Sequence, residues 1–195
     1  MGIRLSLGRL SFGLILIVGI VCSACSPVVI IPDKALESAL RAELKKPLSL
    51  VLTRRNLEQV RKLDASNLGI KNIEGLQFCI HVSELYLQNN VIRDIGQLGP
   101  LTKLVKLHLG DNQIKDIEAV SGLLALEHLD LSGAGNAITD WKHLQANVLN
   151  GGLGADAVVV VPHAHTMDNQ GKPLPGFAGA YDALLQVGVN VIFRD

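Results

Sequence analysis

Leucine, isoleucine and valine recur along the middle of the chain with a period of 22 residues. One column has a leucine in every unit, and three further columns are also aliphatic at the same period. Because a single unit of this length cannot bury its apolar face alone, the pattern predicts units that stack on one another. The columns are Leu63, Leu85, Leu107 and Leu129; Ile70, Ile92 and Ile114; Ile73, Ile95 and Ile117; and Leu76, Leu98 and Val120.

Each unit has the pattern L-x-x-L-x-L-x-x-N-x-I-x-x-I-x-x-L. The L-x-L element predicts a short strand with both leucines facing inward. Asn90 and Asn112 follow where the chain must turn, and their amides can bond backbone groups there. The three-residue spacing of I-x-x-I-x-x-L predicts 3₁₀ turns on the opposite side. The sequence thus predicts an α/β leucine-rich-repeat solenoid, with a curved parallel β-sheet on its concave side and 3₁₀ or helical segments on its convex side.

The flanks of the repeat predict caps that close the stack. Residues 31–46 have Pro32 and Asp33 at a helix start and leucines one turn apart, which predicts an N-terminal helical cap. At the other end, two residues are inserted between Leu131 and Ile138, and the strict period is lost. We divide the chain into a signal peptide of lipoprotein type (1–24), an anchored N-terminus and helical cap (25–59), the 22-residue repeats (60–144), and longer units with a C-terminal cap (145–195).

The segment after the insertion alternates helical and strand patterns. A helix capped by Thr139 or Asp140 and ended by Gly151 places Trp141, Leu144 and Val148 on one face. Two further strands and a second helix are expected, which makes two longer units of about 30 residues that are helical on their convex side. The expected ranges are a strand at 157–161, a helix around 181–186 and a strand at 189–193.

The first residues of the chain resemble an export signal. Arg4 and Arg9 lie before an apolar stretch of about a dozen residues, shorter than the roughly 20 that a membrane-spanning helix needs. Residues 21–25 resemble a bacterial lipobox, in which Cys25 would carry the lipid. Cys22 stands where that pattern prefers leucine.

Localisation depends on how this signal is processed. Acylation of Cys25, followed by Ser26, favours an outer-membrane or cell-surface protein that is held to the membrane by a lipid anchor. The alternative is cleavage by an ordinary signal peptidase near Ala24, which gives a periplasmic or secreted protein.

Composition and charge exclude several functions. Eighteen basic and eighteen acidic residues give a formal charge of zero, which argues against nucleic-acid binding and against a polybasic membrane patch. Aromatic residues make up only 4% of the chain, so the core must be aliphatic. Cys79 falls in the column of Leu101 and Leu123, which predicts a buried thiol that acts as a small apolar side chain. No catalytic or phosphate-binding motif is present, and no cofactor is expected.

With these features the chain resembles the internalin-like leucine-rich-repeat proteins of bacteria. The resemblance rests on the 22-residue unit and the upstream helical cap, and it covers roughly residues 31–144. It implies a curved solenoid whose concave sheet binds protein partners, and it implies no enzymatic activity. The chain departs from larger members of the family in having few regular units and no visible cell-wall sorting signal.

The outward strand positions are the candidate binding residues. In a solenoid, outward side chains of successive strands lie about 4.8 Å apart and line up across the concave face. Mixed charges suit a polar protein epitope, and Tyr86 is the expected anchor because it combines a large contact area with a polar tip. The alternative is that Lys62, Glu84 and Lys106 form solvated pairs of little energetic weight. The candidates are Lys62, Asp64, Glu84, Tyr86, Gln88, Lys106, His108, His128 and Asp130.

Two groups of histidines raise a metal-dependent alternative. Three hypotheses follow: an exported, lipid-anchored module that binds a protein partner; a metal-dependent enzyme centred on His163, His165 and Asp168; and a structural envelope protein without a discrete ligand. We favour the first, with no metal site and no catalytic residue. The two groups are His108, His128 and Asp130 on the sheet, and His163, His165 and Asp168 in the segment PHAHTMD.

Overall fold

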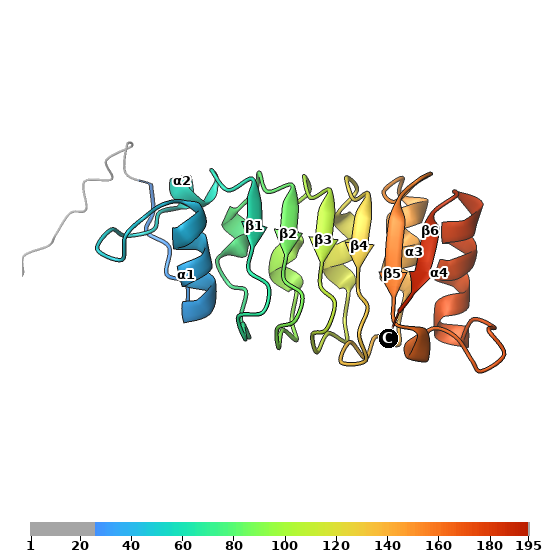
Figure 1. Cartoon of the computed structure of the whole chain (residues 1–195). Helices are drawn as coiled ribbons and strands as arrows, with labels where there is room; N and C mark the ends of the chain where they lie inside the picture. Colours follow the sequence, from blue (N-terminus) through green and yellow to red (C-terminus); the bar gives the residue numbers. More distant parts are fainter. Residues whose placement is uncertain (1–25, 195) are drawn as a thin grey trace, which may run out of the picture.

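The computed structural model of the protein describes residues 26–194, which form an open solenoid on one parallel sheet (Figure 1). Its six strands follow one another in sequence order. Leu63, Leu85, Leu107 and Leu129 pair across the first four strands, which confirms the 22-residue register. The strands are β1 (Lys62–Asp64), β2 (Glu84–Tyr86), β3 (Lys106–His108), β4 (His128–Asp130), β5 (Val158–Val161) and β6 (Asn190–Phe193).

Two helices, α1 (Lys34–Glu43) and α2 (Arg54–Leu57), cap the N-terminal end of the sheet. One carboxylate oxygen of Asp33 accepts the N–H groups of Ala35 and Leu36 at 3.0 and 3.2 Å, as an N-cap does. The other accepts the N–H groups of Lys71 and Asn72 at 2.9 and 3.3 Å. Burial raises the pKa of Asp33, but the four donors outweigh it and the pKa is lowered overall. One side chain thus starts the helix and joins the cap to the first repeat.

Short 3₁₀ helices lie behind the sheet in the regular units, as the sequence predicts: η1 (Leu76–Phe78), η2 (Gly96–Leu98) and η3 (Glu118–Gly122) (Figure 1). Between strand and turn, each unit has one residue with a left-handed backbone. Asn, Asp and Gly tolerate this conformation, so the four units make the same corner. These residues are Asn67, Asn89, Asp111 and Gly133, with φ of 58°, 58°, 51° and 95°.

Buried asparagine amides satisfy the backbone at these corners. The Nδ2 of Asn112 donates to the carbonyl oxygens of Leu87 in the preceding unit and Leu109 in its own, both at 2.9 Å. Asn90 makes the equivalent bonds, which confirms the predicted role. Sequence analysis missed a third member, Asn136, which is fully buried. It follows Asn112 by 24 residues, the period of 22 plus the two inserted residues, so the insertion itself could have located it.

Beyond β4 the convex turns become helices, α3 (Lys142–Leu149) and α4 (Pro175–Gln186), with η4 (His163–His165) between β5 and α4. The expected start of α4 at 181 was wrong, because Pro175 fits the first turn, where no N–H is needed. The expected cap of α3 was also wrong. Trp141 holds the N-cap position without a side-chain bond, while Asp140 accepts the N–H of Lys142 at 3.0 Å. Gly151, with φ of 80°, follows the helix as predicted.

A single apolar core runs through all units and is mostly aliphatic. Trp141 and Phe177 are its largest fully buried side chains, and their rings meet edge to face at 5.1 Å. Cys79 is 1% exposed, as predicted, and burial raises the pKa of its thiol to about 12. No helix in the described residues 26–194 is long and apolar enough to cross a membrane.

Candidate binding face

The concave face is the side of the sheet that carries the outward strand residues, opposite the 3₁₀ helices. In β1 to β4 the central leucine is buried, and the residues on either side of it are exposed or half-buried. Strand register aligns these outward residues in two columns, and Gln88 follows β2 at the same edge. The columns are Lys62, Glu84, Lys106 and His128, and Asp64, Tyr86, His108 and Asp130.

Glu84 is the centre of a charge ladder that crosses three strands. Its carboxylate lies 3.1 Å from the Nζ of Lys62 and 3.4 Å from the Nζ of Lys106. The hydroxyl of Tyr86 donates to the same carboxylate at 3.1 Å. The predicted cross-strand ion pairs therefore form, and Tyr86 is hydrogen-bonded to their shared carboxylate.

Rings from three strands stack beside this ladder. The Tyr86 and His108 ring centroids are 4.8 Å apart, and those of His108 and His128 are 4.7 Å apart. Lys62 covers the outer end of the stack, with its Nζ 5.1 Å from the centre of the Tyr86 ring. Asp130 lies beside the middle ring of the stack, 3.7 Å from Nδ1 of His108. The column residues thus form one connected surface and not a set of separate side chains.

These contacts shift the ionisation of the face. Hydrogen bonds from Lys62 and then Tyr86 lower the pKa of Glu84, and the Glu84 carboxylate raises the pKa of Lys62. Burial lowers the pKa of His128, and the neighbouring His108 lowers it further. The ladder is therefore held charged while the inner end of the ring stack is held neutral.

Two of the predicted carboxylates, Asp64 and Asp130, accept hydrogen bonds from a serine two residues later in the chain. Asp64 accepts the hydroxyl of Ser66 at 2.7 Å and its N–H at 3.1 Å, which lowers the pKa of Asp64. Gln88 has a buried Oε1 that finds no hydrogen-bond partner within residues 26–194. Asp64 therefore shapes the turn after β1, and Gln88 has an unused acceptor beside the face.

The concave face continues over β5 and β6, where it becomes apolar. Val158 and Asn190 extend the column of His128, and Val160 and Ile192 extend the column of Asp130. Sequence analysis predicted both strands and assigned none of these residues to the face. Valines at successive positions hide the two-residue alternation that separates inward from outward positions, so only the register reveals them.

A shallow hollow lies between α1 and the turn after β1, at the N-terminal end of the concave face. It has a volume of about 500 Å³ and is lined by Ala35, Ala39, Leu68 and Asp64 among others. Sequence analysis missed it, because it depends on how closely α1 packs against the first strand.

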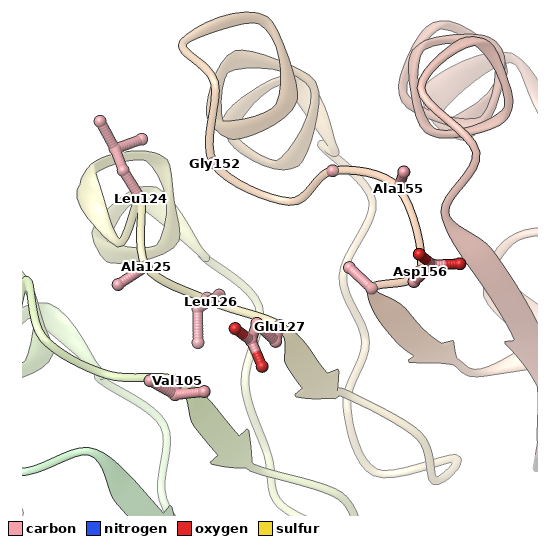
Figure 2. A pocket seen from close by; sticks show the side chains of 10 residues that line it. Val105, Leu124, Ala125, Leu126, Glu127, Gly152, Ala155 and Asp156 are labelled. Atoms are coloured by element: carbon pink, nitrogen blue, oxygen red, sulfur yellow. The ribbon is translucent and has the colours of Figure 1, made fainter.

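A larger groove lies outside the concave face, at the ends of the strands where they begin (Figure 2). It has a volume of about 640 Å³ and separates segment 124–127 from segment 152–157. The groove arises because Glu127 and Ala157 are 30 residues apart, where the regular spacing is 22. Glu127 and Asp156 place carboxylates on its two sides (Figure 2), and glycines and apolar residues line the rest.

The histidine groups do not assemble metal sites. No cluster of three or more His, Cys, Asp or Glu side chains in the described part of the chain could hold a metal ion. In the second group, one oxygen of Asp168 accepts the N–H groups of Gln170 and Lys172, both at 2.8 Å. That carboxylate therefore shapes its own turn, and His163 lies in η4 with its ring against Phe193. Cys25, the predicted lipidation site, lies outside the described residues.

Sequence comparisons find the repeat in part of the chain. Residues 102–146 match a family model described as "Leucine Rich repeats (2 copies)". Human and mouse leucine-rich repeat and IQ domain-containing protein 3 are each 38% identical over 66 residues, which is 34% of this chain. The match spans only 11% and 10% of the length of those proteins.

Solved structures resemble nearly the whole chain. Internalin C2 of Listeria monocytogenes is 26% identical with a TM-score of 0.61, over 85% of this chain and 68% of that one. Internalin F of the same organism is 24% identical with a TM-score of 0.62, over 90% of this chain and 55% of that one. The chain therefore contains leucine-rich repeats, and its fold is a solenoid similar to those of the internalins.

Proposed function

We propose that this protein is an exported, lipid-anchored leucine-rich-repeat module that binds a protein partner through its concave face. The connected surface around Glu84, Tyr86 and His108 carries the proposal. Its side chains already hold one another by ion pairs and ring stacking, so they lose little conformational freedom on binding. Leucine-rich repeats are typical of modules that use their concave surface for binding and not for catalysis.

The chemistry of the face favours a protein over a polyanion. Charges of both signs lie beside an aromatic stack over β1 to β4, and the half-buried Val158 and Ile192 add apolar area over β5 and β6. An apolar region next to a polar one is the usual composition of a protein interface. Tyr86 joins the charge ladder to the ring stack and is the proposed anchor.

Site-specific photo-crosslinking in living cells tests the binding proposal. A crosslinker at Lys106, on the concave face, is expected to capture a discrete protein, whereas one at the exposed Lys115 is not. Tyr86→Ala should then reduce capture from position 106 at least tenfold, the loss expected for a binding hot spot. The matched surface change Lys103→Ala should leave capture unchanged. Absence of any adduct from position 106 would favour a structural role without a discrete ligand.

We further propose that Cys25 carries the lipid and holds the protein at the outer membrane or cell surface. The lipobox-like segment 21–25 and the following Ser26 support this. Mass spectrometry of the mature N-terminal peptide is expected to show an acylated Cys25. An unmodified terminus near residue 25 would contradict the anchor and indicate a periplasmic or secreted protein.

A further inference from the structure

The N-terminal cap carries an unusual concentration of exposed apolar side chains. Five of the ten large hydrophobic residues that are exposed within residues 26–194 lie between residues 28 and 51. Such a concentration on a surface marks a contact with something apolar. We call these five the cap patch: Val28 at 60% exposed, Ile30 at 80%, Leu48 at 80%, Leu50 at 51% and Val51 at 61%.

Backbone pairing brings the two halves of the cap patch together. Val28 bridges Thr53 in antiparallel fashion, and the N–H of Val29 donates to the carbonyl oxygen of Leu52 at 2.8 Å. This register places Ile30 opposite Val51. Because side chains alternate along an extended segment, Val29 and Leu52 face the core while their neighbours face outward.

The loop that carries Leu48 and Leu50 is held in place. Arg41 donates from its guanidinium to the carbonyl oxygens of Pro47 and Leu50 at 3.0 and 2.7 Å. The loop projects from the end of the solenoid opposite β6 (Figure 1). The leucines are thus presented outward by a fixed support.

Basic residues surround the cap patch. Segment 41–55 contains five basic residues and one acidic residue, in a chain whose formal charge is zero. Lys45 and Arg55 are exposed and make no ion pair with any described residue. The sequence analysis expected no polybasic membrane patch, because the chain as a whole is neutral. This one segment lies at the N-terminal end of the solenoid, and the sign of its charges complements anionic lipid headgroups.

The described chain begins directly at this patch. The hydroxyl of Ser26 accepts the N–H of Arg55 at 2.9 Å, and the carbonyl oxygen of Pro27 accepts the N–H of Arg54 at 2.9 Å. The residue next to Cys25 is therefore already fixed to α2. A lipid on Cys25 would enter the membrane beside the cap patch, with no flexible linker in between.

We propose that the cap patch inserts its apolar side chains into the surface of a lipid bilayer, with Lys45 and Arg55 at the headgroups. The membrane then contacts the end of the solenoid opposite β6, and the sheet extends away from it. The concave face stays free to meet a partner. This proposal shares its membrane location with the lipid anchor, but it predicts a fixed contact in addition to a tether.

Quenching by brominated lipid distinguishes a fixed contact from a tether alone. The mature exported protein is reconstituted in vesicles of phosphatidylethanolamine and phosphatidylglycerol, with tryptophan introduced at Leu48 or, as a control, at Leu185. Both positions are exposed, and the native Trp141 is buried and supplies the background. Leu48→Trp is expected to lose at least half of its added emission, and Leu185→Trp less than a tenth. Equal quenching at both positions, or at neither, would overturn the proposal.

A binding measurement separates this proposal from the lipid anchor. If Cys25 proves to be unmodified, the mature protein is added to the same vesicles and floated on a density gradient. The double change Leu48→Glu and Leu50→Glu is expected to lower the bound fraction at least tenfold. Leu68→Glu, at a residue that is 46% exposed on the first repeat, should leave it unchanged. Binding that responds equally to both changes, or is absent, would overturn the cap patch, while the state of Cys25 is settled independently by mass.

Discussion

The strictly periodic units and the longer C-terminal units build one sheet by different means. In the strictly periodic units, 3₁₀ helices and buried asparagines form the turns, and charged and aromatic residues lie on the concave face. In the longer units, α3 and α4 take the place of these turns, and valine and isoleucine lie on the concave face. What both share is an inward aliphatic residue at each strand, since Leu129 pairs with Val159 and Val159 with Val191. Unit length and convex structure can therefore change as long as this inward column continues.

The largest expected loss of folding stability comes from a substitution in the longer units. Trp141→Ala should lower the free energy of unfolding by about 3 to 5 kcal/mol, because it empties the contact with Phe177. Urea unfolding followed by circular dichroism measures the loss, since Trp141 is the sole tryptophan. The control is Trp141→Phe. It should cost clearly less, because the buried Nε1 has no hydrogen-bond partner to lose among the described residues. Equal losses would show that the ring is not packed as described.

Within the regular units, Leu107→Ala should cost about 2 to 5 kcal/mol, because this inward leucine is packed between Leu85 and Leu129 and is fully buried. The matched change Lys115→Ala, at an exposed position of the same unit, should cost less than about 0.5 kcal/mol. The same urea titration applies to both. Similar losses from the two changes would argue against the inward column.

The buried asparagines at the corners are a feature that separates the regular units from the longer ones. Asn112→Ala should cost about 1 to 3 kcal/mol, because it leaves the buried N–H of Ile92 without its acceptor and removes one of the two amide donors to the carbonyls of Leu87 and Leu109. Asn169→Ala, in an exposed loop of the longer units, is the control and should be close to neutral. Thermal unfolding compares them. A neutral Asn112→Ala would mean that water replaces the amide.

The smallest expected effect on stability is a pH dependence that comes from His128, where the polar and apolar parts of the concave face meet. Burial, and then His108, lower its pKa in the folded protein below the ordinary 6.5, so the unfolded chain takes up a proton first as pH falls. The stability contributed by neutral His128 is therefore complete above pH 6.5 and is lost as pH falls through the lower folded pKa. Lys106 and Arg194 also disfavour its protonation, and Asp130 favours it.

Replacing this side chain tests the sign of the effect. His128→Gln should lose less stability than the parent protein between pH 7 and pH 5, as measured by urea unfolding at each pH. Parallel losses in the two proteins would show that His128 titrates alike in the folded and unfolded states.

Much of the fold was predictable because each strict unit repeats the same local demands. Leucine columns set the strand register, Asn90 and Asn112 marked the corners, and Asp33 marked the start of the cap helix. The candidate residues of the concave face could be named from the same period. The errors came where the period ends: the start of α4, the cap of α3 and the missed Asn136.

In the strictly periodic units the sequence by itself determined which residues face inward, since a fixed period leaves one way to bury every leucine. Only the tertiary structure decided how outward residues meet, because their rotamers depend on neighbours in other units. Glu84 bonds lysines on both sides, and Tyr86 stacks on His108 across the strand boundary. The cap patch shows the same limit, since Ile30 and Val51 are distant in sequence and become neighbours only through the pairing of their segments.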